Sequence, residues 1–130
     1  MKLDPGNARC HFNMGVAQNN LGQSRAAWEN LDRAIAANPA LWQAIFYQGN
    51  MALASGDFRV AATKFEEVVQ MSPTADALTN LGAAYAEMGM RNKAAQAFRA
   101  ALHVEPREEK ARRNLEILLS EPSSPAAESR

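Results

Sequence analysis

The sequence contains few of the features that would mark a catalytic, secreted or polyanion-binding protein. A single cysteine, Cys10, cannot form an internal disulfide. Lys plus Arg and Asp plus Glu number 14 each, so no surplus of charge marks a surface for nucleic acid or anionic lipid. No run of 18 apolar residues occurs, and the first residues lack the apolar core of a signal peptide. We therefore expect a soluble, cytoplasmic chain that binds neither nucleic acid nor a membrane.

Residues for catalysis are also scarce. The two histidines lie far apart in sequence, and neither a His-Glu-x-x-His nor a Cys-x-x-Cys spacing is present. The adjacent Cys10 and His11 would point about 100 degrees apart on a helix, so they cannot easily share one ligand. We expect no catalytic, cofactor or metal site and predict that the chain is not an enzyme.

What the sequence does contain is a repeat. Prolines recur at Pro5, Pro39, Pro73 and Pro106, with a period of about 34 residues. Three further series share the same period: Gly15, Gly49 and Gly82; Gly22, Gly56 and Gly89; and Ala27, Ala61 and Ala94. Apolar residues between them recur at three and four, the period of a helix. This pattern predicts seven helices, at about residues 8–21, 24–37, 41–54, 58–71, 75–88, 91–104 and 107–120, and no strand.

Each series has a physical reason. Gly22, Gly56 and Gly89 fall between paired helices, where a residue without Cβ tolerates positive φ. The mid-helix glycines, of which Gly82 is one, cost about 1 kcal/mol relative to alanine, so we expect close approach of the partner helix. The small residues of the alanine series would face them. The prolines would end each repeat, because proline disfavours helix in the residue before it.

These residues resemble the tetratricopeptide repeat family, most clearly in the third repeat. The residues that carry the resemblance there are Leu78, Asn80, Leu81, Gly82, Tyr85, Gly89, Ala94, Phe98, Ala101 and Pro106. The resemblance implies an all-α fold, a right-handed α-solenoid of three helical hairpins plus a carboxy-terminal capping helix. The repeats would span residues 8–41, 42–74 and 75–106, with the cap at 107–120. Departures from the family pattern are His11 and Ile45 at its first aromatic position, Gln18 and Ala52 at its tyrosine, and one residue missing near Thr74.

The two ends of the chain differ. Leu3, Asp4 and Pro5 look like the close of an earlier repeat, so residues 1–7 are expected to be a repeat remnant or a leader. Residues 107–120 keep Asn114 and Leu115 in the family register, but Glu116 stands where the glycine would be, as in a solubilising cap. The proline- and serine-rich residues 121–130 are expected to be disordered.

In the family the first helix of each hairpin lines a concave groove, and the resemblance marks the residues that would face it. They are Arg9, Phe12, Val16, Asn19 and Asn20 in the first repeat; Gln43, Phe46, Asn50, Leu53 and Ala54 in the second; and Asp76, Thr79, Ala83, Ala86 and Glu87 in the third. Phe12 and Phe46 would form a hot-spot pair, with ordinary packing between neighbouring helices as the alternative. The amides would bind the backbone of an extended peptide or would simply be solvated.

Some family members grip an acidic carboxy-terminal peptide with two lysines, an arginine and two asparagines. Starting at the first repeat, the matching positions are Phe12, Val16, Tyr47, Asp76 and Asn80. Starting at the second, they are Phe46, Asn50, Asn80, Lys110 and Asn114, which retain three of the five residue types. Only Lys110 is informative, so such a clamp is a minority interpretation.

The leading hypothesis is a non-enzymatic module that binds a peptide or helix of a partner protein in the groove, as a scaffold or chaperone-like adaptor. One alternative is self-assembly into a homo-oligomer through exposed repeat ends or the groove. The other is a substrate-recruiting appendage of a larger enzyme.

Overall fold

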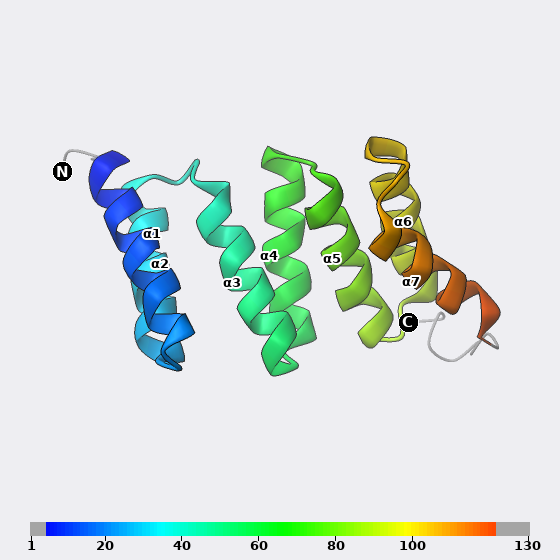
Figure 1. Ribbon diagram of the computed structural model, residues 1–130, viewed down its shortest axis with the longest axis horizontal. Coiled ribbons are helices and arrows are strands. Elements are labelled where there is room, and N and C mark those ends of the chain that lie inside the picture. Colours follow the sequence, from blue (N-terminus) through cyan, green and yellow to red (C-terminus); the bar gives the residue numbers. More distant parts are fainter. Residues whose placement is uncertain (1–4, 122–130) are drawn as a thin grey trace. The chain divides into compact units, whose positions relative to one another are not determined.

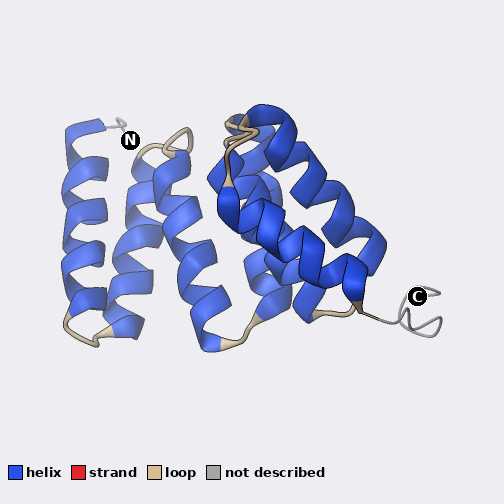
Figure 2. Ribbon diagram, turned by 45° about the vertical axis from the view of Figure 1, so that its right-hand side comes forward, coloured by secondary structure: helices blue, strands red, loops and turns tan. Residues whose placement is uncertain are grey.

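The computed structural model describes residues 5–121, and every regular element in that range is a helix (Figures 1 and 2). Seven helices and no strand lie in this part of the chain, as the repeat pattern predicts. The helices are α1 (Pro5–Asn20), α2 (Ser24–Ala37), α3 (Trp42–Ser55), α4 (Phe58–Met71), α5 (Ala75–Glu87), α6 (Arg91–Val104) and α7 (Glu109–Ser120).

Three of the helices, α2, α4 and α6, have the bounds that the sequence predicts, and the largest difference is at the start of α1. Pro5 begins this helix, whose predicted start is at about residue 8. Proline is tolerated there because the N–H groups of the first turn have no acceptor within the helix, so the N–H that proline lacks is not needed. Residues 1–4 of the predicted remnant and residues 122–130 of the predicted disordered tail lie outside the described residues.

The chain divides into two compact units. The amino-terminal unit, residues 1–48, contains α1, α2 and the first half of α3, and the carboxy-terminal unit, residues 49–130, contains the rest. In the first unit α1 packs against α2. In the second unit α5 packs against α4 and α6, and α7 packs against α6 and α5.

The turns inside the hairpins are built on the glycines expected there. Gly22, Gly56 and Gly89 have φ values of 82, 85 and 77 degrees, the left-handed region that side chains rarely adopt. At the second of these turns the Asp57 N–H donates to the Ala52 carbonyl at 2.9 Å, closing the helix with a Schellman-type bond. The glycines therefore end the first helix of each hairpin, as predicted.

One proline follows the second helix of each of the three hairpins. Pro39, Pro73 and Pro106 each follow a C-cap residue with non-helical backbone: Asn38, Ser72 and Glu105, whose φ values are −144, −151 and −137 degrees. A proline sterically disfavours the helical region in the residue before it, which explains this recurring geometry. The chain then turns into the next first helix.

The mid-helix glycines allow close helix packing; the predicted Ala27 is among the nearest neighbours of Gly15, whereas a phenylalanine ring is nearest to Gly49 and Gly82. A Cβ on Gly49 would lie 2.6 Å from the Phe65 ring, and one on Gly82 would lie 2.6 Å from the Phe98 ring. At Gly15 the nearest atoms are the Ala27 carbonyl oxygen and Leu31 Cγ, both at 3.0 Å. The ring or branched side chain one turn beyond each alanine therefore occupies the space that the glycine leaves.

A buried polar cluster accounts for two departures from the family pattern in the first hairpin. Asn30 is only 4% exposed, and its amide donates to Gln18 Oε1 at 2.7 Å. His11 Nδ1 lies 3.3 Å from Asn30 Oδ1, which also accepts from Arg33 at 3.2 Å. Burial of an amide requires such partners. His11 and Gln18 thus replace the usual aromatic side chains with partners for Asn30.

Candidate functional site

The amino-terminal unit carries an aromatic set on α1 and α3. The Phe12 ring packs edge-on against Tyr47, with centroids 6.2 Å apart, and Asn19 Nδ2 donates to the Tyr47 hydroxyl at 3.3 Å. Phe46 packs edge-on against Trp42 at 6.3 Å. Each member of the predicted hot-spot pair therefore packs edge-on against a different aromatic residue. Tyr47 and Trp42 thus belong to the aromatic set together with Phe12 and Phe46. All four rings remain partly exposed.

The other predicted groove residues of this unit are more accessible. Arg9, Asn20 and Gln43 are exposed, and Val16 is half-buried. The described contacts include no partner that would tie them to a structural role, so they stay predicted binding residues.

In the carboxy-terminal unit two predicted asparagines are joined. Asn80 Nδ2, on α5, donates to Asn50 Oδ1, on α3, at 2.8 Å. This bond leaves the Asn80 carbonyl oxygen and the Asn50 amino group with hydrogen-bonding capacity for a ligand. The pair therefore offers one acceptor and one donor from a fixed arrangement, the groups that a peptide unit requires.

Four residues of α5 lie along one side of that helix. Asp76, Asn80, Ala83 and Glu87 are spaced by four, three and four, which places them on one face and defines the α5 stripe. On α7, Lys110, Asn114 and Ile117 follow the same spacing, and Glu121 comes directly after the helix. These four form the α7 stripe. Each member of the α7 stripe stands one repeat after its counterpart on α5.

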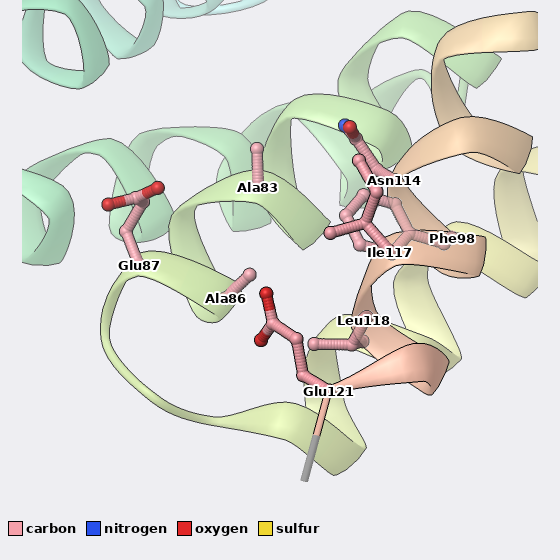
Figure 3. A pocket seen from close by; sticks show the side chains of 8 residues that line it. All are labelled: Ala83, Ala86, Glu87, Phe98, Asn114, Ile117, Leu118 and Glu121. Atoms are coloured by element: carbon pink, nitrogen blue, oxygen red, sulfur yellow. The ribbon is translucent and has the colours of Figure 1, made fainter.

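A pocket of about 220 Å³ lies between α5, α6 and α7 (Figure 3). Both stripes contribute to it. Its lining consists of Ala83, Ala86, Glu87, Phe98, Asn114, Ile117, Leu118 and Glu121. A pocket below the roughly 300 Å³ typical of small-molecule sites suits a single side chain of a larger ligand.

The floor of this pocket depends on the close packing described above. Because residue 82 is glycine, the Phe98 ring of α6 can lie directly beneath α5. Phe98 and Leu118, which are 1% and 6% exposed, belong to the same apolar cluster. The floor is therefore rigid core, whereas Ile117 is 51% exposed and stands on its wall.

The polar groups of the pocket are acidic and amidic. Glu87 and Glu121 bring carboxylates, Asn114 brings an amide, and the lining contains no lysine or arginine. In Figure 3 the Glu121 carboxylate turns into the space between Ala86 and Leu118. Arg91 approaches this carboxylate from α6, but its Nη1 lies 4.0 Å from Glu121 Oε2, a distance at which an ion pair contributes little.

The prediction that Thr79 faces the groove is wrong. Thr79 is 1% exposed, and its hydroxyl donates to the Ala75 carbonyl at 2.7 Å. A threonine satisfied by its own helix can be buried, so its side chain does not reach a ligand. Leu53 is half-buried, and Asp76 and Lys110 are exposed.

The contribution of α7 to the pocket is not predicted by the sequence pattern, which marks that helix as a solubilising cap. Ile117, Leu118 and Glu121 were not proposed as binding residues, although Asn114 was considered as a clamp position. The signal was available, since the positions of Ala83 and Glu87 recur one repeat later as Ile117 and Glu121. Among the described residues we find no group of three His, Cys, Asp or Glu side chains that could hold a metal ion. None of the helices in residues 5–121 has the length and apolar character needed to cross a membrane.

Comparison with known proteins agrees with the hairpin geometry. The profile of the tetratricopeptide repeat family matches residues 12–76 and 48–103. No curated protein matches the sequence. The first tetratricopeptide domain of Spaghetti (RPAP3), bound to the HSP90 peptide SRMEEVD, superposes with a TM-score of 0.85 at 18% identity, over 92% of this chain and 95% of that chain.

Two further solved structures are similar. The amino-terminal domain of stress-induced protein-1 from C. elegans gives a TM-score of 0.79 at 18% identity, over 89% of this chain and 97% of that one. MamA residues 41 to the end from Desulfovibrio magneticus RS-1 gives 0.79 at 28% identity, over 90% of this chain and 65% of that one. Together with the paired helices, the turn glycines and the family match, these similarities show that the chain belongs to the tetratricopeptide repeat family.

Proposed function

We propose that the chain is a non-enzymatic protein-interaction module that binds an extended peptide segment of a partner protein along the α5 and α7 stripes. The observation that carries this proposal is the pocket of about 220 Å³ between α5, α6 and α7. A rigid apolar floor with a few polar groups at its edge is the usual arrangement for anchoring one side chain of a ligand.

The amide pair supports the same interpretation. Asn80 belongs to the α5 stripe, one turn before Ala83 of the pocket, and its bond to Asn50 fixes its orientation. A peptide whose side chain enters the pocket would place neighbouring backbone along this stripe, where the amides can accept and donate hydrogen bonds. Similar structures also bind peptides: one is the RPAP3 domain with SRMEEVD, and another is described as a TPR protein with an unusual peptide-binding site. An adaptor role follows from this mode of binding.

The test is selection of peptides from a random library displayed on phage, with the whole chain as bait. We expect the wild-type chain to enrich related peptides, and Ala83→Trp, which fills the pocket, to weaken the binding of a selected peptide by about tenfold or more. The matched control is Gln96→Trp, which adds the same side chain at an exposed position of α6 outside the pocket lining. Both variants should keep the circular dichroism of the wild type. Equal binding by Ala83→Trp and wild type would contradict the proposal.

A further inference from the structure

The pocket between α5, α6 and α7 combines an apolar floor with two carboxylates, of which Glu121 is only distantly paired, with Arg91. Phe98, Leu118 and Ala86 provide apolar surface, and Glu87 and Glu121 provide the only charged groups in the lining. The chain as a whole is neutral, with 14 basic and 14 acidic residues, so the two carboxylates of the lining do not reflect a general negative charge of the chain.

We propose that the pocket takes a basic side chain, lysine or arginine, of the bound peptide, an inference that rests on the peptide-binding function proposed above. Both residues carry an apolar stem that ends in a cation, so one side chain can cover an apolar floor and reach a carboxylate at its edge. An uncharged apolar side chain would cover the floor but would offer no charge to Glu87 or Glu121. An acidic side chain would be repelled by both.

The two carboxylates occupy equivalent positions of the two stripes. Glu87 ends the α5 stripe, and Glu121, one repeat later, ends the α7 stripe. The two residues therefore bring a carboxylate to the lining of the same pocket from two different stripes. Glu121 is 59% exposed and only distantly paired with Arg91, so an incoming cation displaces a weak interaction at most.

The same geometry argues against an acidic ligand at this end of the chain. The peptide bound to the RPAP3 domain, SRMEEVD, contains two glutamates and an aspartate near its end. Of the positions that the clamp hypothesis would use here, Asn80 is bonded to Asn50, and Asn114 lies in the acidic pocket. Lys110 is the single remaining cation of those positions, and it is not among the residues that line the pocket.

The experiment uses the phage-displayed random peptide library on four baits: wild type, the double variant Glu87→Gln/Glu121→Gln, the double variant Glu87→Lys/Glu121→Lys, and the control Glu116→Gln. Glu116 is an exposed glutamate of α7 outside the pocket lining, so its variant removes one charge from the same helix. We expect wild type and Glu116→Gln to enrich lysine or arginine at one fixed position of the selected peptides. The glutamine variant should lose this preference but still select peptides, and the lysine variant should prefer aspartate or glutamate there.

Each other outcome is decisive. Selection of peptides without a basic position, or the same basic position with both double variants, would overturn the assignment and leave the peptide-binding function standing. A wild-type chain and an Arg130→Ala variant that both select nothing would overturn both proposals. If the wild-type chain also sedimented as a dimer that Ala83→Trp dissociates, the pocket would belong to a second copy of the chain. If instead an Arg130→Ala variant gained peptide binding, the occupant would be the chain's own terminal segment.

Discussion

The Phe98 ring stands in the space that a side chain at position 82 would need. A Cβ on Gly82 would lie 2.6 Å from Phe98 Cε1, and Phe98 is only 1% exposed, so the ring has little room to move. The same relationship holds between Gly49 and Phe65. The pairing fixes how closely α5 and α6 approach, and it forms the floor of the pocket.

We expect Gly82→Ala to lower the free energy of unfolding by about 2 kcal/mol. Alanine gains about 1 kcal/mol of helix propensity, but overpacking a closed core costs up to about 3 kcal/mol. Urea denaturation followed by circular dichroism measures the difference. Phe98→Leu supplies the control, because the first hairpin already pairs Gly15 with Leu31. If the clash is the cause, Gly82→Ala costs less in the Phe98→Leu background; an equal cost would contradict this explanation.

The glycine at the turn between α3 and α4 should respond differently to substitution. Gly56 has a φ of 85 degrees, and a Cβ there meets no atom within 4 Å, so only backbone conformation opposes a side chain. We expect Gly56→Ala to cost about 1–2 kcal/mol of stability, and Gly56→Asn to cost less, because asparagine tolerates the left-handed region. The same denaturation measurement compares the two variants. Equal losses would mean that the positive φ is not what requires glycine.

Particular residues show how much of the fold can be predicted from the sequence. The spacing of glycines and prolines predicted the turns, the helix ends and the close approach of paired helices. It did not distinguish Ala61 from Phe65 as the neighbour of Gly49, because these two residues lie one turn apart on the same side of α4. The hydrogen bonds around Asn30 could not be predicted from the sequence. Its partners Gln18 and His11 are 12 and 19 residues away, and such hydrogen bonds leave no periodic signal.

The candidate site was predicted only in part for a similar reason. Family register marked Asn80, Ala83 and Glu87 on α5, but α7 was judged by Glu116, which stands where a packing glycine would be. That residue describes one face of α7, while Ile117 and Glu121 belong to another. Which faces of two helices enclose a pocket depends on their packing, and the pattern of a single helix does not contain it.

Tyr85 gives a prediction for pH dependence. Burial raises the pKa of Tyr85 above its ordinary value of 10.0, and the hydrogen bond to Glu66 and that carboxylate's charge raise it further. The folded chain therefore holds the phenol proton more tightly than the unfolded chain, and stability falls as pH rises above about 10. Denaturation at several alkaline pH values measures this loss. Tyr85→Phe should abolish the phenol's share of it, and Glu66→Gln should reduce it; an unchanged profile in Tyr85→Phe would assign the loss to other groups.

The amide pair gives the last prediction, which concerns peptide binding. Because Asn80 donates to Asn50 at 2.8 Å, each side chain holds the other in the orientation that presents its remaining donor or acceptor. Removing either one frees its neighbour to rotate, so Asn50→Ala and Asn80→Ala should each weaken a peptide selected by the wild type by about fivefold to tenfold. The double variant should lose little more than either single variant, as expected for groups that act as a unit. Titration of one labelled peptide into the four proteins completes the cycle. Losses that multiply in the double variant would show that the two amides contact the peptide independently, and that their mutual hydrogen bond has no part in binding.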